Sequence, residues 1–95
     1  MPAMNPFSPT QLRALAHTHG TPLWVYDATT IRARIASLTR FDVIRYAQKA
    51  NANLHLLRLM RAQGVRVDAV SLGEITRAQA AGFQASTSGP SDLVF

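Results

Sequence analysis

Apolar residues repeat at helical spacing twice within residues 1–40. The first helix is predicted to begin after Ser8, because serine followed by proline and then glutamine is typical of a helix start, and to end at Gly20. The apolar run at residues 23–26 predicts an extended strand, and Asp27 is a suitable cap for a second helix. One face of each helix is apolar, with Leu12, Leu15 and Ala16 in the first and Ile31, Ile35 and Leu38 in the second.

From residue 43 onward the pattern changes to short apolar runs that alternate with amphipathic segments. It predicts strand, helix, strand, helix and strand over residues 43–47, 54–63, 65–70, 72–81 and 92–95. Such alternation is typical of parallel strands with right-handed helical crossovers, so the expected fold class is α/β. The last strand has barely begun at Phe95. Parallel strands connected by helices can close into a barrel, which takes about eight strands. The pattern therefore predicts a piece of a larger domain.

Composition narrows the function classes. The 95 residues carry a net charge of +5, but the arginines are dispersed along the chain, which favours a solvated surface over a nucleic-acid site. There is no cysteine, no glycine-rich nucleotide loop, and no apolar stretch of about 20 residues for a membrane helix. The beginning of the chain has no secretory pattern, so the expected location is the cytoplasm. The three histidines show no metal spacing, and no metal site is expected.

Lysine occurs once among the ten cationic residues, as Lys49, just after the predicted strand at residues 43–47. A lysine amine can lose its proton and attack a carbonyl, whereas arginine stays protonated. The position therefore suggests covalent chemistry. The alternative is compositional, since an arginine-rich chain with a single lysine must place it somewhere.

Three polar residues lie within or just after the next predicted strand and would lie near Lys49, because working residues of parallel barrels gather at the carboxyl ends of the strands: Asp68 lies inside the strand, and Ser71 and Glu74 follow it. Asp68 can hold the lysine or accept its proton, or it can be a simple polar group at a strand end. Ser71 reads as an N-cap rather than a nucleophile. Glu74 is interpreted first as the partner of Ser71 in a capping box, and second as a catalytic residue.

Four segments resemble, in order and in spacing, the N-terminal part of the diaminopimelate decarboxylases, which belong to the alanine-racemase-like pyridoxal-phosphate enzymes. The resemblance covers about residues 21–83. The segments are Thr21-Pro-Leu-Trp-Val-Tyr-Asp27, Phe41-Asp-Val-Ile-Arg-Tyr-Ala-Gln-Lys-Ala-Asn51, Leu57-Arg-Leu-Met-Arg61 and Val67-Asp-Ala-Val-Ser-Leu-Gly-Glu-Ile75.

The resemblance implies that residues 41–95 begin a pyridoxal-phosphate-binding (β/α)8 barrel, and that residues 1–40 join the family's β domain. It implies that Lys49 holds pyridoxal 5'-phosphate as a Schiff base, with Asp68 and Glu74 near its amine. The implied reaction converts meso-diaminopimelate to L-lysine and carbon dioxide, the last step of lysine biosynthesis, in a homodimer without nucleic-acid or membrane partners.

The family's phosphate-binding loop and the residues supplied by a second subunit have no counterpart in these 95 residues, so the chain alone is expected to be inactive. Two other interpretations stay open at this point. One is another decarboxylase of the same fold, acting on ornithine, arginine or carboxynorspermidine. The other is a small basic binding module without catalysis.

Overall fold

The computed structural model describes residues 5–86, 88–89 and 91–95. It divides into two compact units, residues 1–31 and 32–95. Among the described residues, no helix combines the length and the hydrophobicity needed to span a bilayer.

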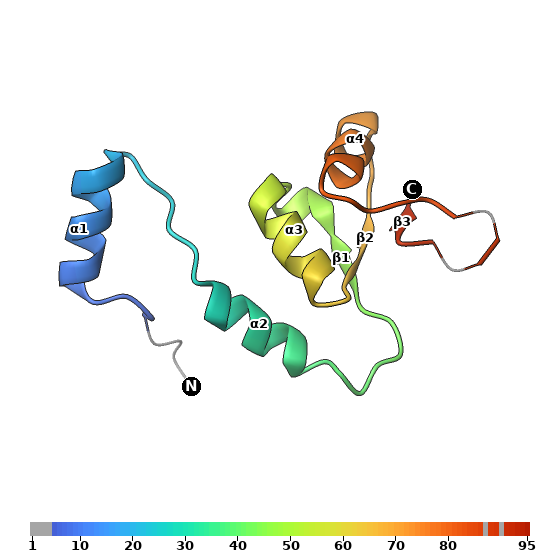
Figure 1. Cartoon of the computed structure of the whole chain (residues 1–95), viewed down its shortest axis with the longest axis horizontal. Helices are drawn as coiled ribbons and strands as arrows, with labels where there is room; N and C mark the ends of the chain where they lie inside the picture. The colour runs from blue at the N-terminus through green and yellow to red at the C-terminus, as the bar shows by residue number, and fades with distance from the viewer. Residues whose placement is uncertain (1–4, 87, 90) are drawn as a thin grey trace. The chain divides into compact units, whose positions relative to one another are not determined.

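The first unit contains helix α1 (Pro9–His19) and the start of α2 (Ala28–Ala36) (Figure 1). The predicted caps are confirmed. The Ser8 hydroxyl accepts from the Gln11 N–H at 3.1 Å, the Gln11 side chain accepts in return from the Ser8 N–H, and Asp27 accepts from the Thr30 N–H at 3.1 Å. These bonds satisfy helix N–H groups that have no partner within the helix.

The strand predicted at residues 23–26 is not formed, and this part of the prediction is wrong. Residues 23–27 have no regular secondary structure, and Trp24 is 86% exposed. A strand needs a hydrogen-bonded neighbour. The sheet of the described residues consists of three later strands and does not include this segment.

The second unit has a parallel sheet of β1 (Arg45–Ala47), β2 (Arg66–Asp68) and β3 (Leu93–Val94), in that order. Helix α3 (Leu54–Ala62) connects β1 to β2, and α4 (Leu72–Ala80) connects β2 to β3. The α/β class and the parallel order are confirmed, although each strand is shorter than its apolar run.

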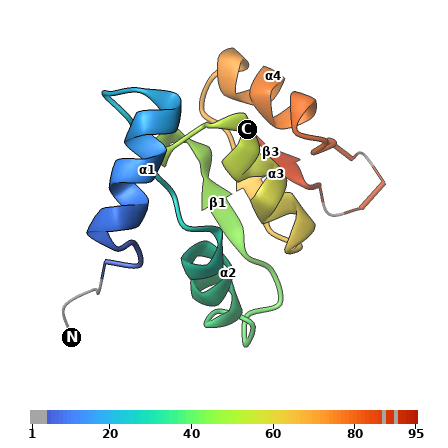
Figure 2. The same ribbon diagram turned by 60° about the vertical axis from the view of Figure 1, so that its left-hand side comes forward.

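One face of this sheet is covered by the two helices (Figure 2). Tyr46, Val67 and Leu93 are paired across the three strands and therefore share that face. The buried cluster beneath the helices consists of Leu57, Val67, Ala69, Ala78, Ala81, Phe83 and Leu93, with Tyr46, Leu54 and Ile75 packed against it. Burial of this cluster is the main stabilising contribution in a unit of this size.

Both covering helices end in the same way. After α3, the Gly64 N–H donates to the Arg61 carbonyl and the Val65 N–H to the Met60 carbonyl; Gly82 and Phe83 repeat this pattern after α4. The two glycines have φ of 81° and 104°, in the region that disfavours side chains with a Cβ. The turns direct the buried residues Val65 and Phe83 back into the core.

Candidate functional site

Lys49 lies just beyond the carboxyl end of β1, as predicted. The chain leaves β1 in a single turn of 3-10 helix, η1 (Gln48–Ala50), which is closed by a bond from the Asn51 N–H to the Gln48 carbonyl at 3.1 Å. The Lys49 side chain is exposed, and no ion pair within the described part of the chain involves it. Its amine is therefore accessible to a ligand.

Three side-chain hydrogen bonds fix the backbone around Lys49. The Tyr46 hydroxyl donates to the Asn51 carbonyl at 2.8 Å and so spans the turn from its beginning to its end. Gln48 Nε2 donates to the Glu74 carbonyl at 2.8 Å, and Arg77 Nη1 donates to the Ala52 carbonyl at 3.3 Å. The last two bonds connect residues 48–52 to α4, so the lysine stands on a turn with little freedom of its own.

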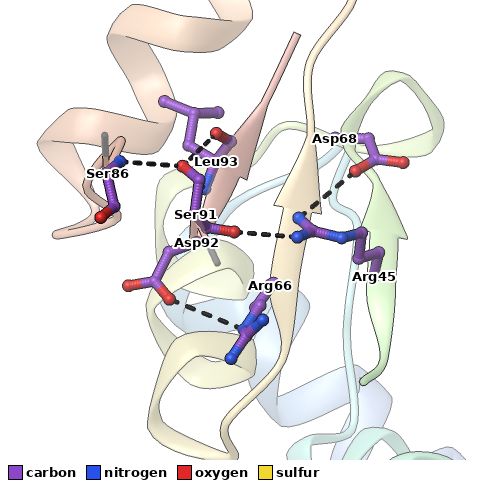
Figure 3. A network of polar contacts seen from close by, with 7 residues as sticks. All are labelled: Arg45, Arg66, Asp68, Ser86, Ser91, Asp92 and Leu93. Carbon is purple, nitrogen blue, oxygen red and sulfur yellow. Dashed lines mark hydrogen bonds and ion pairs between the residues drawn. The ribbon is translucent and has the colours of Figure 1, made fainter. Parts of the chain in front are cut away.

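Asp68 occupies the same edge of the sheet, where it pairs with Ala47 across the ladder. The closest cation to its carboxylate is Arg45, whose Nη1 lies 3.7 Å from Oδ1 (Figure 3). Asp68 Oδ1 is buried and accepts no hydrogen bond from the described residues, although the side chain as a whole is 49% exposed. The structure thus brings Asp68 to the edge that Lys49 occupies, without an ion pair between them.

Arg45 also bridges to the segment before β3, because its Nη2 donates to the Ser91 carbonyl at 2.9 Å. Arg66 Nε lies 3.8 Å from Asp92 Oδ1 on the same side of the sheet. Figure 3 shows these contacts passing from β1 to β2 and on to the segment that leads into β3. Half-exposed ion pairs contribute little stability each, so their main effect is to orient the charged groups.

Glu74 lies in the first turn of α4 and acts there as a structural residue. Its Oε1 accepts from the Val70 N–H at 3.2 Å, and its Oε2 lies 3.4 Å from the Ser71 hydroxyl. Ser71 in turn accepts from the Glu74 N–H at 3.2 Å. The predicted cap is formed, except that Glu74 reaches the N–H of Val70 rather than that of Ser71. Among the described residues, no ion pair joins Glu74 to Lys49.

Sequence reasoning missed Gln48 as a site residue. Its side chain is fully buried, next to the lysine on the chain. The available signal was the alternation along the strand predicted at residues 43–47. Tyr46 packs against the buried cluster, and Gln48 follows it at the same spacing, whereas Arg45 and Ala47 point to the other face. An amide at a helix-facing position predicts a specific hydrogen bond, since buried polar groups are usually paired.

The residues present fit the part of a pyridoxal site that supplies the lysine amine. Lys49 offers an accessible primary amine on a fixed turn at the carboxyl edge of a parallel sheet, and Asp68 places a carboxylate on the neighbouring strand. A phosphate-binding loop is not identifiable in the sequence.

Comparisons with known proteins point in the same direction. Residues 29–95 match the family described as pyridoxal-dependent decarboxylase, pyridoxal binding domain. The diaminopimelate decarboxylase of Streptomyces coelicolor is 70% identical over 74 residues, which cover 78% of this chain and 17% of that protein. The diaminopimelate decarboxylase of Escherichia coli K12 is 63% identical over 76 residues, which cover 80% of this chain and 18% of that protein.

A solved structure, described as the crystal structure of diaminopimelate decarboxylase, superimposes with a TM-score of 0.85 at 58% identity. The match covers 90% of this chain and 20% of that chain. The present chain therefore spans about a fifth of the length of the relatives it matches. The resemblance stated from the motifs is confirmed, and because the family match covers most of the sequence, this chain belongs to the pyridoxal-dependent decarboxylases, within their pyridoxal-binding domain.

Proposed function

We propose that this chain acts as part of a diaminopimelate decarboxylase, which converts meso-diaminopimelate to L-lysine and carbon dioxide. The observation that carries the proposal is Lys49, the single lysine of the sequence, exposed at the carboxyl end of β1 on a turn fixed by three side-chain bonds. The 70% identity to the Streptomyces coelicolor protein supports this substrate.

In this proposal Lys49 binds the cofactor through its Nζ atom. When bound, pyridoxal phosphate supplies an electron sink for the bond that breaks. The role of the chain itself is to present the amine in one orientation, which reduces the entropy lost when the reacting groups meet. The carboxylate of Asp68, on the neighbouring strand, either holds the Lys49 side chain in position or accepts a proton from Lys49 Nζ. Glu74 contributes through the first turn of α4, by fixing the backbone at residues 70–74.

The wider architecture is proposed on similar grounds. Residues 41–95 would form the first strand–helix units of a (β/α)8 barrel, supported by the parallel order β1-β2-β3 and by helices on one face. Val94 of β3 is 40% exposed and alternates with the buried Leu93, so it faces away from the helices, as interior residues of such a barrel do. Residues 1–40 would join a β domain. The homodimer and the cytoplasmic location stay predictions.

The alternatives are less well supported. Each of the relatives compared above is a diaminopimelate decarboxylase, which favours that substrate over ornithine, arginine or carboxynorspermidine. For a basic binding module, the arginines would need to gather on one surface. Arg45 and Arg66 are instead paired with Asp68 and Asp92.

The test joins this chain to the remainder of the Streptomyces coelicolor relative, in place of the matching residues. The chimera is incubated with pyridoxal phosphate, reduced with borohydride and mapped by peptide mass spectrometry. We expect the label on Lys49 and growth without lysine in a bacterial strain that lacks diaminopimelate decarboxylase. Lys49→Arg is the control, because it keeps the charge and removes the reactive amine. Label on a different lysine, or growth supported by Lys49→Arg, would exclude the proposal.

A further inference from the structure

Among the described residues, Gln48 is a buried polar residue in a core that is otherwise apolar. Its side chain has no exposed surface and ranks with Phe83, Leu57 and Val67 among the largest fully buried side chains. Nε2 donates to the Glu74 carbonyl at 2.8 Å. Oε1 is buried as well and accepts no hydrogen bond from any described residue.

Packing alone does not explain an amide at this position. Methionine has a similar length, would fill the same space, and would leave no oxygen without a partner. The amide carries a desolvation cost that its single hydrogen bond offsets only in part. What the amide provides and methionine does not is a bond of fixed direction and length between η1 and α4.

That bond acts directly beside the reactive amine. Gln48 and Lys49 are successive residues of the same 3-10 turn, so the direction of one side chain constrains the direction of the other. Gln48 points into the core toward α4, while Lys49 is exposed. The acceptor is the Glu74 carbonyl, in the helical turn that Ser71 and the Glu74 side chain fix by capping. The bond from Gln48 therefore fixes the orientation of the Lys49 turn relative to the capped first turn of α4.

The other bond between these segments is weaker. Arg77 Nη1 reaches the Ala52 carbonyl at 3.3 Å from an exposed position, where water competes for both groups. The bond from the Tyr46 hydroxyl to the Asn51 carbonyl joins two residues on either side of the turn. Among the described contacts, Gln48 provides the buried link between the lysine turn and the helix.

We propose that Gln48 is a positioning residue for Lys49, which holds the 3-10 turn against α4 so that the Lys49 amine meets the cofactor in one orientation. The inference rests on the proposed function, since it assumes that Lys49 binds pyridoxal phosphate.

The first test compares Gln48→Met with the unchanged sequence in the chimera described above. The readouts are the dissociation constant for pyridoxal phosphate, from visible absorbance, the borohydride label on Lys49, and the Tm of the cofactor-free protein. We expect the dissociation constant to rise about ten- to hundred-fold, as for a misplaced reacting group. We expect the Tm to stay the same or rise, because a buried oxygen without a partner is removed. The matched control is Gln79→Met, the same change at an exposed position of α4, which should alter neither value.

The second variant, Gln48→Glu, adds a pH-dependent readout of the bond to the Glu74 carbonyl. A protonated carboxyl can donate to the Glu74 carbonyl as the amide does, whereas a carboxylate cannot. Burial raises the pKa of a carboxyl. The folded protein therefore favours the protonated form, and this contribution is present at low pH and lost as the pH rises through the raised pKa. Relative to the unchanged protein at each pH, cofactor affinity should be retained at low pH and lost at higher pH.

The outcomes separate the two proposals. If the unchanged chimera leaves Lys49 unlabelled, the proposed function is wrong, and the positioning role of Gln48 is refuted as well. If Lys49 is labelled and Gln48→Met binds pyridoxal phosphate within about twofold of the unchanged protein, only the positioning role is refuted. A fall in Tm that accompanies the loss of affinity would also refute it, because Gln48 would then act through folding.

Discussion

Leu57 is the residue whose truncation should disturb the second unit most. Its side chain has no exposed surface and joins α3 to the cluster that contains Val67, Ala78 and Phe83. Leu57→Ala removes buried methyl groups from the contact between helix and sheet, and it leaves a cavity that neighbouring side chains fill only in part. We expect a loss of about 3 kcal/mol in the free energy of unfolding, within the usual range for a fully buried leucine.

That loss is large for this chain. A protein of 95 residues has a typical unfolding free energy of about 5 to 14 kcal/mol. With a urea dependence of about 1.5 kcal/mol per molar, the unfolding midpoint should fall by about 2 M. The assay is urea unfolding of the 95-residue chain followed by far-UV circular dichroism.

The control is Leu72→Ala in α4, because Leu72 is 77% exposed and the change deletes little buried surface. Its effect should stay within about 0.5 kcal/mol. Equal shifts for the two variants would refute the assignment of Leu57 to the core. A parent chain without a cooperative transition would contradict the packed unit itself.

Two further changes test the ends of the helices. Gly82→Ala should destabilise the chain more than Gly64→Ala: both have positive φ, but a Cβ at Gly82 would lie 3.0 Å from Arg61 Nε, whereas Gly64 faces open space. Each substitution should lower the free energy of unfolding by about 1 kcal/mol for the left-handed backbone alone. If the contact with Arg61 causes the larger effect at Gly82, the additional change Arg61→Ala should make the two substitutions equal in cost. A difference that persists with Arg61→Ala would contradict the reasoning. Asn53→Ala should cost about 1 kcal/mol and reduce the helicity of α3, because Asn53 Oδ1 accepts from the N–H groups of His55 and Leu56. Urea unfolding measures all of these, and an Asn53→Ala chain as stable as its parent would disprove the capping role.

The sequence was sufficient to place the candidate amine. Lys49 stood out because no other lysine occurs, and its position after an apolar run placed it at a strand end. The apolar pattern also predicted the order of strands and helices from residue 43 onward, and the motifs indicated the family. The sequence did not reveal that the Asp68 carboxylate lies beside Arg45, because that contact joins residues on two strands whose register only the folded sheet sets.

The sequence by itself determined local features, namely the helix caps at Ser8, Asp27 and Ser71. Each cap joins groups within a few residues of one another, so the pattern alone specifies it. The tertiary structure decided the strand limits, the absence of a strand at residues 23–26, and the bond from Gln48 to α4. A strand exists only where a distant segment supplies hydrogen-bonding partners, and an amide is buried only where the fold supplies an acceptor.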